Sequence, residues 1–396
     1  MDLGRWRHTE KQMLLPRRAG GNAVSSAPLN MQVPYFDLKL QYAGIRDEIR
    51  AALDQVCDST AFILGEEVSQ FEKEFAAYCE TQYCVALNSG TSALHLALLA
   101  AGVGEGDEVI TTPNTFIATA EAISYIGAKP VYVDIDRSTA NINPKQIDAA
   151  ITRKTKAIVP VHLYGRPADM KPILDIAKRR RLVVVEDACQ AHGARYRGKR
   201  VGGLGQSAAF SFYPAKNLGA YGEGGALTTN DEQVAQTVRA LRDHGSTRRY
   251  FHDRVGFNYR MDGFQGAVLR VKLKYLAAWT AKRQEYAALY RKLLKNARLE
   301  LPEDGSRDEN VYHLFVVYVD DRDAVRAVLE SRGIQTAVHY PMPLHLQQAY
   351  ASLGYKRGDF PHAERACARV LALPIFPELT NDQVEYVAKT LVEIVD

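Results

Sequence analysis

Lys216 has the clearest potential for chemistry in this sequence. It follows the apolar run 208–212 and precedes a glycine-rich segment that ends at Gly224 and Gly225. A lysine amine that is held away from water has a lowered pKa and becomes a nucleophile towards a carbonyl carbon. Most lysines are simply solvated, so this segment alone leaves both interpretations open.

Two other apolar runs are followed by polar residues that could bind a ligand. Asp187 comes shortly after the run 182–185, where a buried acid is costly unless it meets a cation such as a protonated heterocyclic nitrogen. Gly90 and Thr91 follow the run 84–87 and open a helix whose free backbone N–H groups suit a phosphate. Taken singly, each motif could equally be an ordinary cap of a turn or helix.

Together, the amine, the acid and the phosphate turn match the needs of one cofactor. Pyridoxal phosphate requires a Schiff-base amine, a partner for its pyridinium nitrogen and a phosphate anchor. Phe116, which opens the helix after the next strand, could stack on the ring. Because ligands bind beyond the carboxyl ends of the strands in open α/β sheets, we expect all these residues at one edge of a sheet.

The elements that would position these residues follow an alternating pattern. From about residue 84 to residue 244, short β-rich runs alternate with stretches of helical length, which is typical of parallel strands joined by crossover helices. The class is α/β, with one mostly parallel sheet. The seven predicted strands are residues 84–87, 109–111, 131–134, 157–163, 182–185, 208–212 and 226–229.

The chain divides into three parts. Residues 1–30 are interpreted as a disordered extension, with Met31 as the hypothetical natural start. Residues 31–274 form the large, cofactor-binding domain, and residues 275–396 form a smaller α+β domain reached through a helix over 275–296. In the small domain we predict strands at 312–319 and 335–340, a helix at 322–332 and a last helix that starts with the capping signature Thr380-x-x-Gln383.

Composition excludes several classes of protein. The formal net charge is +4, and five basic against two acidic side chains in residues 1–30 leave the rest nearly neutral, which argues against nucleic-acid binding. No apolar run is long enough to cross a membrane. The five cysteines include no C-x-x-C pair, so neither a disulfide framework nor a metal site is expected, and a reducing cytoplasm fits best.

Four segments carry a specific resemblance. They are residues 90–94, 186–193, 211–225 and 256–261, and they resemble the DegT/DnrJ/StrS nucleotide-sugar aminotransferases, over a region from about Val33 to the C-terminus. The resemblance implies the fold of the aspartate aminotransferase superfamily, that is, a fold-type-I enzyme that uses pyridoxal phosphate or its pyridoxamine form. By that resemblance, Lys216 would hold the cofactor and shuttle protons, Asp187 would keep the ring nitrogen protonated, and Gln190 would sit near the ring hydroxyl.

The same resemblance implies a shared active site. Gly90, Thr91 and Ser211 would bind the cofactor phosphate, and Asn258 would reach that phosphate from a second subunit. A homodimer is therefore expected from the resemblance alone.

The branch of the family follows from segments 160–165, 211–225 and 339–347, which look most like those of enzymes acting on 3-keto sugars. The implied reaction moves an amino group from L-glutamate to a nucleotide-linked 3-keto-6-deoxyhexose, giving a 3-amino sugar. His339 and Tyr340 could face the sugar, and Arg249 and Tyr250 could approach the nucleotide phosphates. For these four residues, a purely structural role is an equal alternative.

Other functions stay open. The substrate could instead be a 4-keto sugar or a 3-keto-2-acetamido sugar. A sugar dehydratase on the same fold would usually carry histidine in place of Lys216, which counts against that activity. A non-catalytic sensor that retains the cofactor pocket is the remaining alternative.

Overall fold

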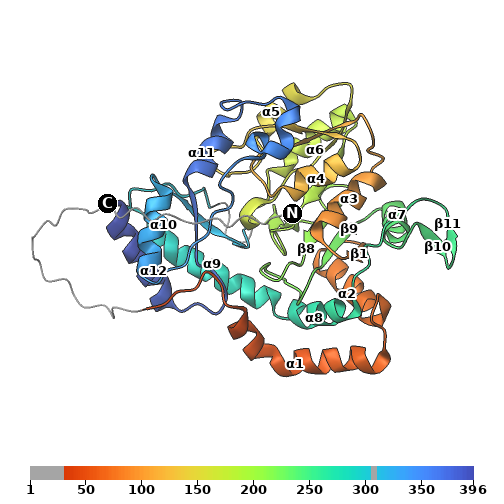
Figure 1. Ribbon diagram of the computed structural model, residues 1–396, viewed down its shortest axis with the longest axis horizontal. Helices are drawn as coiled ribbons and strands as arrows, with labels where there is room; N and C mark the ends of the chain where they lie inside the picture. Colours follow the sequence, from red (N-terminus) through yellow and green to blue (C-terminus); the bar gives the residue numbers. More distant parts are fainter. Residues whose placement is uncertain (1–30, 305–309) are drawn as a thin grey trace, which may run out of the picture.

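A seven-stranded sheet forms the centre of the larger part of the molecule (Figure 1). The computed structural model describes residues 31–304 and 310–396, so the predicted extension over 1–30 lies outside the described residues. The strand order is β1-β9-β8-β5-β4-β2-β3. The strands are β1 (Tyr83–Leu87), β2 (Glu108–Thr111), β3 (Lys129–Tyr132), β4 (Thr155–Ile158), β5 (Val183–Asp187), β8 (Ser207–Ser211) and β9 (Gly225–Thr229).

The sheet confirms the predicted α/β class and the seven predicted strands. β9 pairs antiparallel with β1 and with β8, whereas the other pairings are parallel. Most of these strands are apolar on both faces because helices cover both sides, which is why the sequence shows continuous apolar runs instead of alternation. The observed β4 ends at Ile158, so residues 159–163 of the prediction are not strand.

Two layers of helices enclose the sheet. One face packs on α3 (Gly90–Ala100), α4 (Ala118–Tyr125) and α7 (Glu232–Arg242) through a cluster that includes Val85, Leu87 and Leu227. The opposite face packs on α2 (Gly65–Tyr78) through Phe71, Phe75, Phe210 and Phe212, and on α5 (Pro144–Ala150) and α6 (Met170–Arg180) through a separate aliphatic cluster. Helices therefore cover both faces of the sheet.

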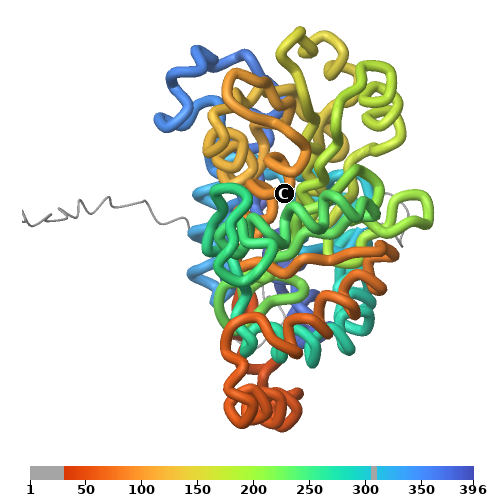
Figure 2. Tube along the Cα trace, turned by 90° about the vertical axis from the view of Figure 1, so that its right-hand side faces the viewer, coloured from red at the N-terminus to blue at the C-terminus, as the bar shows by residue number. Residues whose placement is uncertain are grey.

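Other helices complete this part of the fold. α8 (Gly263–Leu273) packs on α2, and α1 (Leu38–Ser59) packs on α8. In Figures 1 and 2, α1 projects from the lower end of the molecule. Two short hairpins are attached to the body, β6–β7 (Arg195–Tyr196, Lys199–Arg200) and β10–β11 (Ser246–Arg248, Phe251–His252). In Figure 1, β10–β11 lies beyond α7, at the side opposite α10 and α12.

The C-terminal elements form a second core. α9 (Leu276–Leu293) leads to β12 (Phe315–Tyr318), α10 (Arg322–Ser331), α11 (Pro361–Arg369), β13 (Val370–Leu373) and α12 (Asn381–Val395), with 3-10 turns at Leu344–Leu346 and Gln348–Leu353. Their apolar faces share one cluster around Tyr290, Phe315 and Leu391. The predicted capping box is confirmed, since Thr380 Oγ1 accepts from Gln383 N and Gln383 Oε1 accepts from Thr380 N.

One predicted strand of the small domain is wrong. Residues 335–340 make only a single bridge, between Ala337 and Ala372, and the peptide between His339 and Tyr340 is cis. Val338 packs against the core of the C-terminal elements, but apart from that bridge the segment has no strand partner among the described residues. The strand partner of β12 is β13, which the sequence reading did not identify.

The division of the chain near residue 275 stays a proposal. Val33, at the other end of the described chain, bridges to Ile334 and is buried in the cluster of the C-terminal elements. Residues 31–36 thus pack with the second core, although the chain continues from them into α1.

Candidate active site

A cavity of about 670 Å³ lies at the carboxyl ends of the central strands. One wall consists of the ends of β5 and β8 and the start of α3, and the other consists of the C-terminal elements and residues 35–36. Nine sequence-predicted site residues line it: Gly90, Thr91, Phe116, Asp187, Gln190, Ser211, Lys216, His339 and Tyr340. Tertiary folding thus brings together segments that are far apart in the sequence.

Asp187 is a buried carboxylate that faces this cavity. Its Oδ2 accepts a hydrogen bond from Thr119 Oγ1 at 2.7 Å, and its Oδ1 accepts from Cys189 N at 3.2 Å. Within the described chain, no lysine, arginine or histidine forms an ion pair with Asp187. A buried carboxylate of this kind favours a cationic ligand group beside it.

The adjacent Glu186 has a different task, because successive residues of a strand point to opposite faces. It is fully buried on the other face, where its carboxylate accepts from Gly202 N, Leu204 N and Gly205 N at 3.1, 2.8 and 2.9 Å. His162 Nε2 lies 3.1 Å from the same group. Glu186 therefore fixes the loop that leads into β8, and only Asp187 is available to a ligand.

Lys216 lies in the loop after β8 and lines the cavity. Burial lowers the pKa of Lys216, and Cys189 and Asp187 oppose part of that shift. Its Nζ makes no hydrogen bond to any residue in the described part of the chain. The loop itself is anchored, because Asn217 Nδ2 donates to Val311 O at 3.0 Å and the buried Lys272 Nζ donates to Gly219 O. An anchored loop with a free, desolvated amine suits attack on a carbonyl carbon.

The turn before α3 forms the third part of the site. Ser89 caps the helix by accepting from Ser92 N at 3.0 Å, which leaves the backbone N–H groups of Gly90 and Thr91 at the helix start. A Cβ on Gly90 would lie 2.7 Å from Ser211 Cβ and 2.8 Å from Cys189 Sγ. Only glycine lets this turn approach β8 so closely, and the resulting cradle has the N–H groups and hydroxyls that bind a phosphate.

Gly225 supports the same turn from β9, and this gives a testable prediction. A Cβ on Gly225 would lie 2.2 Å from both the carbonyl carbon and the oxygen of Ser89. Gly225→Ala must displace this backbone, and we expect at least about tenfold weaker cofactor binding from the strain of overpacking. Equilibrium dialysis against pyridoxal phosphate would measure it.

Gly222 offers the matched control for that substitution. It lies in the loop that leads into β9, three residues before Gly225, but a Cβ there would meet only the side-chain end of Gln265, at 3.0 Å. Gly222→Ala should therefore bind the cofactor as the unaltered protein does. Equal loss in both variants would show that the loop, and not the contact with Ser89, sets cofactor affinity.

Gln190 joins the two walls of the cavity. Its Oε1 accepts from Tyr164 N at 2.7 Å, and its Nε2 donates to Tyr340 Oη at 3.3 Å. The hydroxyl of Tyr164 in turn donates to His339 O at 2.5 Å. Phe116 has 53% of its surface exposed, and its ring lies 5.8 Å from that of Tyr340. An exposed aromatic face in a cavity offers a platform for a planar ligand.

Three predicted residues lie away from this cavity. Arg249 and Tyr250 occupy the turn of the β10–β11 hairpin, where Tyr250 is 78% exposed and Arg249 packs on its ring at 5.0 Å. Asn258 is exposed beyond that hairpin and bridges to Asp243. None of the three lines the cavity of its own chain.

Several lining residues were missed by the sequence analysis. They are Tyr35, Thr119, Glu223, Arg283 and His313, among others. Burial, with a contribution from Lys216, holds the pKa of His313 well below its usual range, and that of His339 falls to about 4 for the same causes. Both imidazoles are therefore neutral at physiological pH. No local pattern marks Arg283, since it lies within a helix rich in Lys and Arg.

The chemistry of the cavity fits pyridoxal phosphate. Lys216 supplies the amine, Asp187 the anion for a protonated ring nitrogen, and the α3 turn with Ser211 the phosphate cradle. The described residues contain no cluster of side chains suited to a metal ion, and all five cysteines are free.

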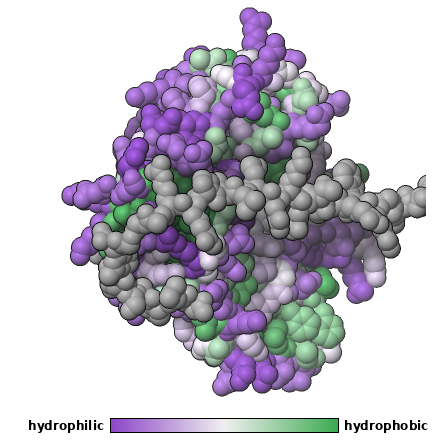
Figure 3. Space-filling model, turned by 60° about the vertical axis from the view of Figure 1, so that its left-hand side comes forward, coloured by the Kyte–Doolittle hydropathy of each residue, from purple (hydrophilic) through white to green (hydrophobic). Residues whose placement is uncertain are grey.

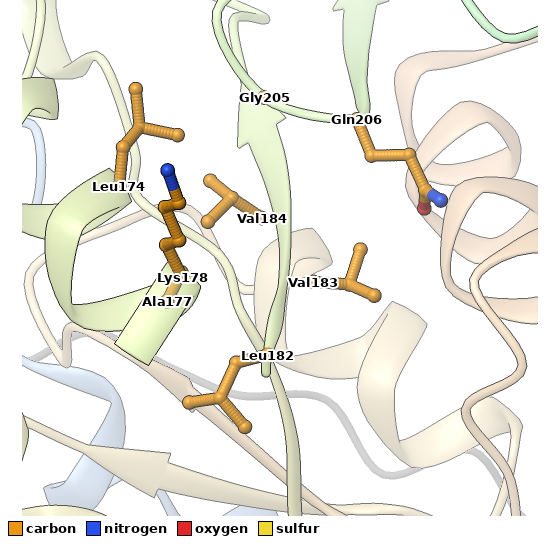
Figure 4. A pocket seen from close by; sticks show the side chains of 8 residues that line it. All are labelled: Leu174, Ala177, Lys178, Leu182, Val183, Val184, Gly205 and Gln206. Atoms are coloured by element: carbon orange, nitrogen blue, oxygen red, sulfur yellow. The ribbon is translucent and has the colours of Figure 1, made fainter. Parts of the chain in front are cut away.

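A second depression, of about 260 Å³, lies near the opposite end of β5, and its lining has no comparable combination of an amine, a carboxylate and a phosphate cradle. Figure 4 shows its side chains, which are mostly aliphatic, with Lys178 as the one charged group among the eight.

In residues 31–304 and 310–396, no helix has the length and apolar character needed to span a membrane.

Comparison with known proteins agrees with this geometry. Residues 44–392 match the model of the DegT/DnrJ/EryC1/StrS aminotransferase family. The chain is 50% identical over 366 residues to a pleiotropic regulatory protein of Geobacillus stearothermophilus, covering 92% of this chain and 98% of that protein. It is 46% identical over 361 residues to a dTDP-3-amino-3,4,6-trideoxy-alpha-D-glucose transaminase of Streptomyces venezuelae, covering 91% and 95%.

A solved structure is similarly close. S. venezuelae DesV, in complex with a ketimine intermediate, superposes with a TM-score of 0.90 at 46% identity, over 92% of this chain and 99% of that one.

Proposed function

Because this chain belongs to the DegT/DnrJ/EryC1/StrS aminotransferase family, we propose that it moves an amino group from L-glutamate to a nucleotide-linked 3-keto-6-deoxyhexose, giving a 3-amino sugar nucleotide. The chain is a pyridoxal-phosphate-dependent aminotransferase. The observation that carries the proposal is the convergence of Lys216 and Asp187 in one cavity, in a chain 46% identical to a dTDP-3-amino sugar transaminase.

Each residue has a proposed task. When bound, the cofactor supplies an electron sink that stabilises negative charge on the substrate carbon. Lys216 Nζ moves the proton between the substrate and cofactor carbons, and the Asp187 carboxylate holds a proton on the ring nitrogen. Gln190 orients the ring hydroxyl, and Phe116 covers one face of the ring.

The remaining tasks are phosphate and sugar binding. Gly90, Thr91 and Ser211 bind the cofactor phosphate, and His339 and Tyr340 face the sugar. Both residues line the cavity, where His339 O accepts from Tyr164 Oη and Tyr340 Oη accepts from Gln190 Nε2, and this supports the assignment.

The proposed assembly is a homodimer with shared sites. Large apolar side chains are exposed on α1, in the link from α1 to α2 and at the cavity; they include Leu40, Phe62, Ile63, Phe116 and Tyr213. Figure 3 shows a mostly hydrophilic face with hydrophobic side chains gathered towards its lower end, the level at which α1 and α8 lie in Figure 1. Exposed apolar surface of this kind supports an interface.

In such a dimer, residues away from their own cavity serve the partner's site. Asn258 would donate to the cofactor phosphate of the other subunit, and Arg249 and Tyr250 would contact the nucleotide phosphates there. All three residues are exposed on or next to the β10–β11 hairpin, which makes them available to a partner.

Mixing two impaired variants, at a cofactor concentration too low to saturate Asn258→Ala, tests the shared site. Lys216→Ala and Asn258→Ala homodimers should each be impaired, whereas hybrid dimers contain one site with both residues intact and should recover activity. For Asn258→Ala, the loss of one charge-assisted hydrogen bond should weaken cofactor binding about 10- to 100-fold. Absence of recovery in verified hybrids would place Asn258 and Lys216 in the same chain's site.

The reaction itself is tested with a panel of substrates. The holoenzyme is incubated with glutamate and nucleotide-linked 3-keto and 4-keto sugars, with and without a 2-acetamido group, and the products are identified by mass spectrometry and NMR. Amination at C3 is expected, and amination at C4 would contradict the proposal. Since one relative is named a regulatory protein, a chain that binds the cofactor but never reacts with an amino donor would indicate a sensor instead.

A further inference from the structure

Arg283 of α9 is a buried cation in the cavity wall that the C-terminal elements form. Only 7% of its surface is exposed, and it lines the cavity. Its Nη1 donates to three backbone carbonyls, of Ile375, Tyr312 and His313, at 2.7, 3.2 and 3.4 Å. These contacts occupy Nη1 and fix the plane of the guanidinium group.

The other edge of the same group has no partner. Arg283 Nε is buried without a hydrogen bond, and Nη2 donates to no residue in the described part of the chain. No carboxylate there forms an ion pair with Arg283; Glu378 acts on it only electrostatically. Nε–H and one Nη–H of arginine point the same way from one edge, and this edge matches the two oxygens of a carboxylate. A buried cation without a counter-ion is costly, so the free edge indicates a ligand anion.

Two further polar atoms on this wall lack partners. Tyr35 Oη and His339 Nδ1 are both buried without a hydrogen bond. The two rings stack at 6.1 Å with 19° between their planes, and both residues line the cavity. Three unsatisfied buried atoms from three separate segments on one wall are unusual, because native proteins satisfy most such groups.

We propose that Arg283 and Tyr35 bind a carboxylate of the amino donor, with the free guanidinium edge taking both oxygens and the phenol donating to one. This inference rests on the proposed aminotransferase function. The proposed sugar substrate carries no carboxylate, whereas an amino-acid donor carries one on the carbon next to the reacting amine. Arg283 and Lys216 line the same cavity, as a donor whose carboxylate and reacting carbon are bound together requires.

The test follows the two half-reactions of the holoenzyme separately through the cofactor absorbance. Arg283→Met should raise the KM for glutamate roughly 10- to 100-fold, as expected for the loss of charged hydrogen bonds, and leave the amine transfer to the sugar unchanged. Arg283→Lys keeps the charge but loses the pair of N–H donors on one edge, so its KM for glutamate should lie between those of the wild type and of Arg283→Met. Tyr35→Phe should raise the same KM several-fold.

A non-reacting ligand gives a readout that does not depend on turnover. Glutarate, a dicarboxylate without an amine, should bind the wild-type holoenzyme by calorimetry and compete with glutamate, and its affinity should fall in the order wild type, Arg283→Lys, Arg283→Met. The matched control is Arg291→Met, on the same helix: Arg291 also donates to a backbone carbonyl, of Pro302, but does not line the cavity. It should behave as wild type towards both ligands.

Different outcomes would contradict the carboxylate site at Arg283 and the proposed aminotransferase function on which it rests. Wild-type enzyme that never reacts with glutamate contradicts the proposed function. Wild-type reaction together with unchanged glutamate KM and glutarate affinity in the Arg283 variants overturns only the carboxylate site. A loss confined to sugars that carry a uronic-acid carboxylate would assign Arg283 to the acceptor and also overturn the inference. If Arg283→Met does not fold, Arg283→Lys and Tyr35→Phe decide the question by the same measurements.

Discussion

Lys216→Ala is expected to abolish the yellow colour of the holoenzyme and to reduce amine transfer by on the order of 10²- to 10⁴-fold, the usual contribution of a positioned proton-transfer group. The variant loses both the amine that captures the cofactor aldehyde and the base that moves the proton. The lowered pKa of Lys216 increases the fraction of neutral amine at physiological pH, and this favours capture of the aldehyde.

Reduction with borohydride makes this prediction site-specific. Reduced wild-type protein should carry the cofactor on the peptide that contains Lys216, as found by mass spectrometry. Lys272 is the appropriate competitor, because it is also buried and burial lowers its pKa to about 8, yet it does not line the cavity. Exposed Lys178 is the control for substitution itself, and Lys178→Ala should keep full colour and activity. A label on Lys272 would contradict the assignment of Lys216.

Asp187→Asn is expected to give the second large effect, a loss of about 10²- to 10³-fold in amine transfer. Asparagine keeps one oxygen, which can accept from the Cys189 amide, and its NH₂ group can donate to the Thr119 hydroxyl, but the negative charge that holds a proton on the ring nitrogen is lost. The cofactor should still bind, because Lys216 and the phosphate cradle are unchanged. Single-turnover kinetics with glutamate would measure the loss, and the absorbance of the bound cofactor would report its protonation.

The neighbouring carboxylate provides the contrast. Glu186→Gln should lower the free energy of unfolding by about 1–3 kcal/mol, since one acceptor of the three backbone N–H groups is weakened or replaced by a donor. The rate of amine transfer, expressed per folded molecule that carries the cofactor, should change little in Glu186→Gln. Thermal unfolding followed by circular dichroism distinguishes the two variants. If Asp187→Asn and Glu186→Gln lose stability alike and lose activity alike, the assignment of only one of them to the ligand is wrong.

Local patterns were sufficient for much of the fold and for one wall of the site. The apolar runs predicted all seven strands because strands buried on both faces must be continuously apolar. Gly90, Asp187 and Lys216 stood out because each comes within four residues of the end of such a run. The capping box at Thr380 was equally local. Residues 335–340, by contrast, have the composition of a strand but not its partner, and sequence pattern alone cannot reveal whether a partner is present.

The opposite wall was decided by tertiary structure. Tyr35, Arg283, His313 and His339 come from four segments spread over some three hundred residues, and only the packing of the second core against the sheet places them together. Which of Glu186 and Asp187 faces the ligand depended on the pleat of β5 and on the loop behind it. Neighbours along the chain set which chemical groups follow the strands, so these groups can be predicted locally. Which groups meet across the cavity depends on long-range packing, which no local pattern encodes.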